Sequence, residues 1–189
     1  MDSTRERLID AATRLLDEGG PAAVTLREVG RLAGVSHNAP YKHFADKEDL
    51  LAAVAARELG RDGGGRPAPA PGADALREMM HSYVRWAIRH PARFKLTFGA
   101  WSTDSAELAQ AATAARAGLV EAVRTAQDAG DLPPGDPERV AALVLAVAHG
   151  AADLEISGHL AKAGKGHASA DDLVDDLLCH LARVRYGAG

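Results

Sequence analysis

The chain has 189 residues, of which 47% are hydrophobic and 25% charged, and its formal net charge is −4. These values are ordinary for a soluble globular protein with one or two domains, and they argue against a generally basic nucleic-acid binder. The single cysteine, Cys179, excludes an intramolecular disulfide, and its apolar neighbours suggest a small buried filler. No apolar run is long enough to span a bilayer, so we expect a cytoplasmic protein with no membrane partner.

The N-terminal sequence predicts two helices by their start signals. Ser3 and Glu6 form a capping box ahead of an amphipathic stripe, and the first helix should end at the Gly-Gly-Pro sequence of residues 19–21. Thr25 and Glu28 form a second capping box. A short helix should therefore begin at Thr25, with its apolar face toward the first helix.

A tight turn and a further helix should follow. Gly34 should end the helix that begins at Thr25, because glycine enters the left-handed cap conformation without steric penalty. Ser36 can cap a helix that runs to Phe44, with Pro40 in its first turn, where proline is best tolerated. Two short helices joined by a tight turn can lay a helix across DNA.

The composition of the segment from Ser36 to Phe44 favours DNA contacts over core packing. Asn38 can pair bidentately with adenine, Ala39 can touch a thymine methyl group, and the Tyr, Lys and His side chains can donate to phosphates. The alternative is an exposed connector helix, since such patterns have many false positives. The first 60 residues hold 8 Lys and Arg against 10 Asp and Glu, so attraction to phosphate must come from charge placement.

The next segment predicts a linking helix and a domain boundary. Asp46 can cap a helix from Lys47 to about Gly60. From there the sequence GRDGGGRPAPAPGA has no periodic apolar face and predicts a flexible linker. The predicted organisation is a helix-turn-helix domain at 1–59, including the linking helix 47–59, a linker at 60–72, and a helical domain at 73–189.

The second domain begins with a helix that carries aromatic residues. Helical patterning returns at Ala73 and stops at His90, because Pro91 disfavours helical geometry in the residue before it. Most of the aromatic residues lie between Tyr83 and Trp101. They could line a cavity for an apolar ligand or simply fill the core. The candidate ligand-pocket residues are Met79, Tyr83, Trp86, Phe94, Phe98, Trp101 and His149.

Three more helices are predicted: an Ala-rich one from about Asp104 to Ala129, one from Asp136 that fades near Gly164, and one that starts at Ser169. The last two carry apolar stripes wider than a local core needs. Such a pair suggests an interface that a dimer would turn into a four-helix bundle. The candidate dimer-interface residues are Val140, Val144, Val147, Leu154, Leu173, Leu177, Leu181 and Val184.

Four motifs, Thr25–Val29, Ala33–Ser36, Tyr41–Phe44 and Lys47–Leu51, together resemble the DNA-binding domain of TetR-type transcriptional regulators. The match covers the first quarter to third of the chain, with the motifs in the family's order and at its distances. It implies an all-α fold, with an N-terminal three-helix helix-turn-helix head and a C-terminal helical bundle for ligand binding and dimerisation. It also implies a repressor: a homodimer that binds a palindromic operator in double-stranded DNA and a small-molecule effector.

The residues that match the family's motif form the candidate DNA-binding surface. The resemblance implies that some face the major groove and that others, such as Thr25, His43 and Lys47, hold phosphates. The complete set is Thr25, Arg27, Ser36, His37, Asn38, Ala39, Tyr41, Lys42, His43 and Lys47.

Later segments are similar to a C-terminal subclass of these regulators that is named for a Trp-His-Gly signature. The matching residues are 89–99 and 147–152, although no Trp follows Trp101. His149 and Asp153 could share a helix face, but two ligands are too few for a metal site. No phosphate-binding glycine loop or hydrolase motif occurs, so we expect no cofactor, no metal and no enzyme. A helical small-molecule-binding protein without DNA binding and a small all-helical enzyme remain as alternatives.

Overall fold

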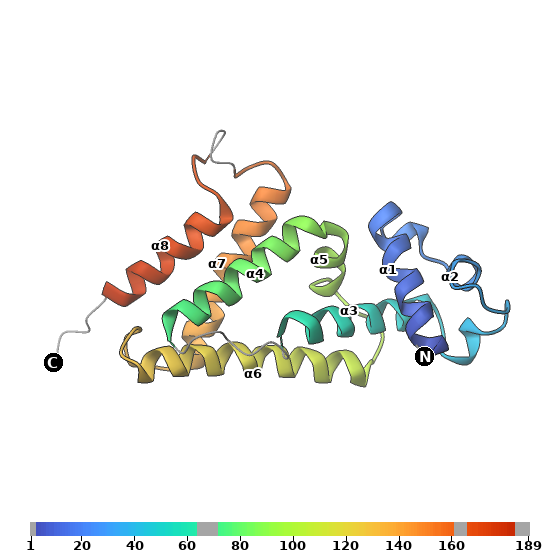
Figure 1. Ribbon diagram of the computed structural model, residues 1–189, viewed down its shortest axis with the longest axis horizontal. Helices are drawn as coiled ribbons and strands as arrows, with labels where there is room; N and C mark the ends of the chain where they lie inside the picture. The colour runs from blue at the N-terminus through green and yellow to red at the C-terminus, as the bar shows by residue number, and fades with distance from the viewer. Residues whose placement is uncertain (1–2, 64–71, 161–165, 184–189) are drawn as a thin grey trace. The chain divides into compact units, whose positions relative to one another are not determined.

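The computed structural model describes residues 3–63, 72–160 and 166–183. Within these ranges the chain forms eight α-helices and one short 3-10 helix (Figure 1), which confirms the all-α prediction. The chain divides into two compact units. The first comprises the residues up to Arg61 together with His90–Ala114, and the second comprises Asp62–Arg89 together with the residues from Ala115 onward.

The first unit is built from α1 (Thr4–Ala23), α2 (Leu26–Leu32), the 3-10 helix η1 (Pro40–Lys42), α3 (Lys47–Gly63) and α5 (Pro91–Thr97). Helix α1 packs against α2 and α5, and α2 packs against η1. Apolar side chains of α1, α2 and α3 form one continuous core. Its most deeply buried members are Leu8, Ile9, Leu16, Val24, Val29, Leu50 and Val54.

The predicted helix starts of the first unit are confirmed. The side chains of Ser3, Thr25 and Asp46 each accept a hydrogen bond from the backbone N–H three residues later, at 3.2, 3.2 and 2.9 Å. Each bond satisfies a donor that a helix start leaves unpaired. Helix α1 breaks where predicted, since Gly19 and Gly20 have non-helical backbone angles and Gly20 has a φ of +66°.

The helix predicted from Ser36 to Phe44 is wrong, because only the single 3-10 turn η1 forms there. Pro40 explains the difference: it has no N–H to donate to the Ser36 carbonyl, as an α-helix would require. That carbonyl instead accepts from Ala39 N at 2.9 Å, and the next two backbone bonds also span three residues. Within this described segment η1 has no side-chain cap, so the cap predicted at Ser36 is also wrong.

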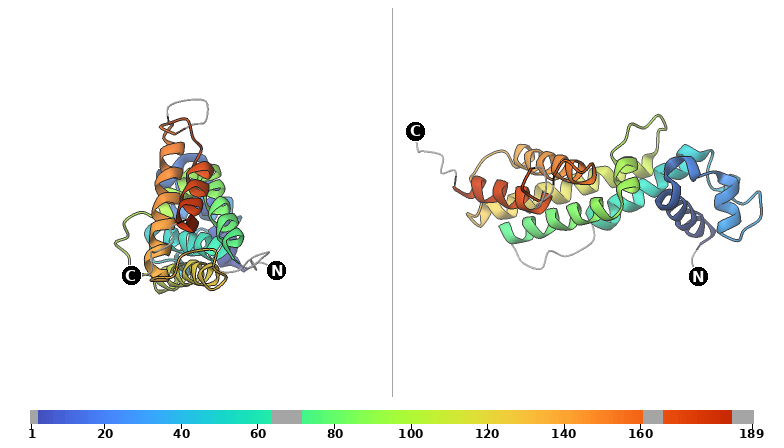
Figure 2. Two further views of the ribbon diagram at one scale, coloured as in Figure 1. Left: turned by 90° about the vertical axis from the view of Figure 1, so that its left-hand side faces the viewer. Right: turned by 90° about the horizontal axis from the view of Figure 1, so that it is seen from above.

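The second unit contains α4 (Ala73–Arg89), the larger part of α6 (Ala106–Asp128), α7 (Pro137–Ile156) and α8 (Ala170–Arg183). Helices α4, α7 and α8 pack against one another (Figures 1 and 2). All four helices contribute to one core. Its buried members include Leu76, Val84, Val123, Val144, Ala148, Val174 and Leu178.

The predicted starts of α7 and α8 are confirmed. Asp136 Oδ1 accepts from Glu138 N at 2.9 Å, and Pro137 occupies the first helical position. Ser169 and Asp172 form a reciprocal capping box, since Asp172 N donates to Ser169 Oγ at 3.2 Å and Ser169 N donates to Asp172 Oδ2 at 2.8 Å.

Helix α7 ends earlier than predicted, at Ile156 rather than near Gly164. Gly158 has a φ of +73°, so it adopts the left-handed conformation that closes a helix. The bond from His159 N to Leu154 O, 2.8 Å long, completes this cap. The prediction missed that Gly158 ends the helix.

Two further expectations differ from the structure. Cys179 is exposed, because its neighbours Val174 and Leu178 occupy the buried face of α8. Helix α3 continues to Gly63 instead of ending near residue 60. Residues 64–71 of the expected linker lie outside the described residues, as does Val184. The domain boundaries at 59 and 72 stay predictions.

Candidate functional site

The turn after α2 is closed by a glycine cap. Gly34 has a φ of +64°, and its N–H donates to Arg31 O at 3.2 Å. Val35 N donates to Gly30 O at 3.1 Å, which is the paired pattern of a Schellman motif. The turn predicted from Gly34 is confirmed.

An arginine of α1 holds this turn from outside. Arg7 Nη2 donates to the carbonyl oxygens of Ala33 and Gly34, at 2.5 and 3.4 Å. These carbonyls belong to the end of α2, which carries partial negative charge. Arg7 therefore fixes the turn to α1, a role that sequence reasoning missed.

The segment 36–43 presents polar side chains to solvent. Pro40 is buried and Phe44, which follows the segment, is 2% exposed, so these two residues anchor it to the core. The rings of His37 and Tyr41 lie 6.2 Å apart in an edge-on arrangement. Ala39 is half-buried. The exposed members of the predicted surface in this segment are Ser36, His37, Asn38, Tyr41, Lys42 and His43.

Residues of the predicted DNA-binding surface also flank the segment on both sides. Thr25 and Arg27 are exposed at the start of α2, and Lys47 is half-buried at the start of α3. Lys42 and Lys47 form no ion pair with any residue in the described ranges. Arg31 instead pairs with Glu28 at 2.5 Å, and the hydrogen bond from Arg31 is the main reason why the pKa of Glu28 is lowered.

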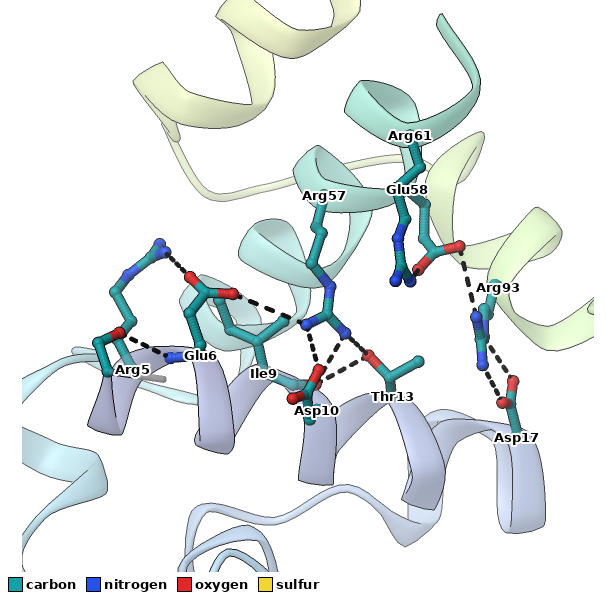
Figure 3. A network of polar contacts seen from close by, with 11 residues as sticks. Arg5, Glu6, Ile9, Asp10, Thr13, Asp17, Arg57, Glu58, Arg61 and Arg93 are labelled. Atoms are coloured by element: carbon teal, nitrogen blue, oxygen red, sulfur yellow. Dashed lines mark hydrogen bonds and ion pairs between the residues drawn. The ribbon is translucent and has the colours of Figure 1, made fainter. Parts of the chain in front are cut away.

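A polar network ties α1 to α3 and α5 (Figure 3). Arg57 of α3 binds Asp10 Oδ1 at 2.5 Å and Thr13 Oγ1 at 2.7 Å. Arg93 of α5 binds both carboxylate oxygens of Asp17, with Nε to Oδ1 at 2.8 Å, and lies 3.5 Å from Glu58. Arg93 of α5 thus bridges α1 and α3.

This network was missed by sequence reasoning. The only signal for it is that an arginine and a glutamate follow the apolar run of α3, where a core face would be expected to continue. Glu58 is only 2% exposed, and a buried carboxylate requires cationic partners.

The seven candidate ligand-pocket residues fall into both units. In the second unit, Tyr83 Oη lies 2.9 Å from His149 Nδ1, and the Tyr83 and Trp86 rings lie 6.1 Å apart. Met79 packs against the same core. Burial raises the pKa of Tyr83. Burial also lowers the pKa of His149, although the negative charge of Asp153 acts in the opposite direction and raises it.

The other candidate residues belong to the first unit. Phe94 is buried with its ring 5.6 Å from that of Phe98, which is 40% exposed. Trp101 packs against the core of this unit. Trp101 also lines a groove of about 540 Å³, together with Pro21, Glu48, Leu51, Lys95 and Leu96. A single pocket formed by all seven residues stays a prediction.

The candidate dimer residues differ in exposure. Val144 is 1% exposed and belongs to the core of the second unit, whereas Leu154 is 45% exposed. Val140, Val147, Leu173, Leu177 and Leu181 are half-buried. Leu143, which is 44% exposed, belongs to the apolar stripe of α7 but not to the candidate set, although its spacing to Val147 and Leu154 places the three on one face of the helix.

The described residues contain neither a membrane-spanning helix nor a metal-binding cluster. None of the described helices has the length and apolar character to cross a membrane. In the same residues, no three His, Cys, Asp or Glu side chains gather where they could hold a metal ion.

Two family models match the chain. The model described as bacterial regulatory proteins, tetR family, matches residues 8–54, which run from α1 into α3. The model described as tetracyclin repressor-like, C-terminal domain, matches residues 76–177, from α4 into α8. The second match alone spans more than half of the chain.

The chain is also similar in sequence to known transcriptional regulators. The HTH-type transcriptional regulator BetI of Rhizobium meliloti is 34% identical over 97 residues. That stretch is 51% of this chain but 48% of BetI, so the match spans about half the length of that relative.

Solved structures cover more of the chain. A protein of unknown function from Rhodococcus sp. RHA1 has a TM-score of 0.77 and 30% identity, over 97% of this chain and 95% of that one. RolR, solved in complex with resorcinol, has a TM-score of 0.66 and 19% identity, over 94% and 87%, and shows the fold alone. The predicted helix-turn-helix head with a C-terminal helical domain is confirmed, and the chain belongs to the TetR family of bacterial regulatory proteins.

Proposed function

We propose that the chain is a sequence-specific DNA-binding transcriptional regulator that acts as a homodimer on a palindromic operator. The observation that carries the proposal is the segment 36–43. Six of its eight side chains are exposed, while Pro40 and Phe44 hold its backbone against the core. Exposed polar side chains on a rigidly anchored backbone are what base recognition in the major groove requires.

The charges around the segment support contact with DNA phosphates. Lys42 and Lys47 have no ion-pair partner in the described part of the chain, so their ammonium groups are available to phosphate oxygens. Lys47 also begins α3, and the unpaired N–H groups of a helix N-terminus add to the attraction. In this arrangement Asn38 contacts base edges and Lys47 holds the backbone.

Dimerisation would place two copies of the segment in successive major grooves. The exposed Leu143 and Leu154 give α7 an apolar stripe that a second copy can cover. A twofold dimer matches a palindromic operator when its two recognition segments lie about 34 Å apart, one turn of DNA.

The second unit would bind a small-molecule effector that releases the repressor from DNA. Its polar pair, Tyr83 and His149, can orient a ligand, and RolR, which shares this fold, was solved with resorcinol. The effector must bind the two conformations of the dimer unequally, because a ligand with equal affinity for both would regulate nothing.

The test is selection of bound duplexes from a random DNA pool by the purified protein, without ligand and at moderate salt. A palindromic consensus with half-sites about one helical turn apart supports the dimeric regulator. Recovery of no sequence above the background of non-specific DNA overturns it and favours a small-molecule-binding protein without DNA binding.

A further inference from the structure

Two arginines at the start of α1 contact the two ends of the segment 36–43. Arg7 donates to two carbonyl oxygens of the turn that precedes the segment. The guanidinium group of Arg5 lies over the ring of Phe44, which follows the segment, with its Cζ atom 5.4 Å from the ring centroid. A cation within about 6 Å of an aromatic face is attracted by the ring. The first residues of α1 therefore hold the exposed segment from both sides.

Acidic side chains keep the Arg5 guanidinium group in this position. It forms an ion pair with Glu107, in the first turn of α6, and its Nη1 atom lies 4.0 Å from Glu6 Oε1 (Figure 3). The Arg5 side chain is only 33% exposed. The ring on one side and the carboxylates on the other thus restrict the conformations that Arg5 can adopt.

Phe44 connects Arg5 to the backbone of the segment. Its side chain is 2% exposed, and its N–H donates to Pro40 O at 3.0 Å. The same oxygen accepts from His43 N, also at 3.0 Å. A 3-10 turn has poorer hydrogen-bond geometry than an α-helix, so η1 depends on the packing of its neighbours. A contact that fixes the Phe44 ring therefore also steadies the turn.

We propose that Arg5 and Arg7 are positioning residues for DNA recognition, and that Glu107 acts through Arg5. Arg7 fixes the start of the segment 36–43 and Arg5 fixes its end, so the exposed polar side chains keep one arrangement in the free protein. A surface that is ordered in advance loses less conformational entropy on binding. The role in DNA recognition rests on the proposed function, whereas the ordering of the free protein does not.

The first test measures exchange of single backbone amide protons with water by NMR, in the full-length protein without DNA. Arg5→Met should speed exchange at residues 43–44 about two- to fivefold, the effect expected for loss of a cation–π contact at a partly exposed site. The amides at 34–35, which close the turn before the segment, should not change. Arg7→Met should give the opposite pattern, with faster exchange at 34–35 only.

The two arginine variants are controls for each other, because each removes one positive charge from the start of α1. Unchanged exchange at residues 43–44 in Arg5→Met overturns the proposal. So does equal acceleration at Val54, in the core of the first unit, because the whole unit would then be destabilised. Glu107→Gln should also speed exchange at 43–44, since Arg5 loses the carboxylate that orients it.

The second test compares affinity for the selected operator with affinity for a scrambled duplex, by fluorescence anisotropy. Removal of a negative charge strengthens binding to any DNA through electrostatics alone. Glu107→Gln should nevertheless lower the ratio of specific to non-specific affinity, by about threefold, because Arg5 is no longer oriented. Glu121→Gln, which neutralises another exposed carboxylate of α6, should leave this ratio unchanged.

Arg5→Met should lower the same ratio, whereas Arg14→Met, at an exposed position of α1, should not. Equal loss of specific and non-specific affinity in Arg5→Met would make Arg5 a phosphate contact and overturn its positioning role. An unchanged ratio in Glu107→Gln overturns the role of Glu107. If the operator selection recovers no sequence, the proposed function fails, and the exchange measurements still decide whether the arginines order the segment.

Discussion

The ring of Pro40 packs directly against the backbone of Gly30. A Cβ atom at residue 30 would lie 2.9 Å from Pro40 Cγ, closer than side-chain atoms ordinarily approach, and 3.5 Å from Pro40 Cδ, which is an ordinary contact distance. Gly30 lies in the last turns of α2, and Pro40 begins η1. The contact thus sets how near the exposed segment 36–43 lies to the helix that supports it.

Gly30→Ala should therefore destabilise the first unit by about 1–3 kcal/mol relative to Gly60→Ala, because the methyl group added at residue 30 must displace the Pro40 ring. Urea denaturation followed by circular dichroism measures the loss. Gly60→Ala is the matched control: a Cβ there meets nothing within 4 Å, and alanine favours a helix by up to about 1 kcal/mol. Equal stability of the two variants would show that the Gly30–Pro40 contact is not tight.

Local signals explain which parts of the fold could be predicted. The caps at Ser3, Thr25, Asp136 and Ser169 depend on residues two or three positions away, and all four formed where expected. The α-helix expected from Ser36 to Phe44 did not form, for an equally local reason. Pro40 has no N–H to donate to the Ser36 carbonyl, so a single 3-10 turn formed instead.

The parts of the structure that could not be predicted depend on contacts between residues that are distant in sequence. Arg93 meets Asp17 across 76 positions, and no pattern within α5 indicates this partner. The groove beside Trp101 combines α3, α5 and the end of α1, so its lining could not be deduced from the aromatic cluster alone. Residues on a helix face can be predicted from periodicity, but which helix covers that face cannot.

Arg93→Met should destabilise the first unit by about 3 kcal/mol. The change removes the bridge between Asp17 and the 2% exposed Glu58, and removal of one partner from a buried ion pair leaves a poorly compensated charge. Arg93→Lys should cost less, since it keeps the charge but not the bidentate geometry. Chemical denaturation monitored by circular dichroism gives these free energies.

The control for Arg93 is Arg124→Met. Its ion pair with Glu121 is exposed on both sides, at 51% and 65%, so we expect a change of about 0.5 kcal/mol or less. If Arg93→Met lowers the free energy of unfolding no more than this control does, the network of Figure 3 contributes nothing measurable to stability.

Stability of the second unit should fall with pH below about 6.5 because of His149. Burial lowers the pKa of His149 from 6.5, so the unfolded chain takes up a proton at a pH where the folded chain does not. The stabilisation that His149 provides to the folded state is complete above pH 6.5 and is lost as the pH falls below 6.5. Melting temperatures of the wild type and His149→Gln, measured between pH 7.5 and about 5, should show a flatter profile for the variant.

His159→Gln, at an exposed position just after α7, provides the comparison for His149. It should keep the pH profile of the wild type. Parallel profiles for the wild type and His149→Gln would mean that His149 takes up its proton equally in both states.

Leu154→Glu should shift the proposed dimer toward monomer. The leucine is 45% exposed on α7, and a charge in an apolar interface loses the burial of that side chain, about 2 kcal/mol per protomer. Sedimentation velocity measures the shift. Ile88→Glu changes a 36% exposed residue of α4 outside the candidate interface and should leave the dimer intact. Dissociation by both variants, or by neither, would place the interface elsewhere.

Lys47→Ala and Asn38→Ala should weaken DNA binding in different ways. Lys47 is expected to hold a phosphate, so its loss should weaken specific and non-specific binding alike and reduce the salt slope by about one unit. Asn38 is exposed in the segment 36–43 and is expected to contact a base, so its loss should cost about 1–3 kcal/mol on the preferred sequence only. Fluorescence anisotropy with specific and scrambled duplexes at several salt concentrations separates the two effects. A Lys47→Ala protein with unchanged affinity and salt slope would mean that the start of α3 does not touch DNA.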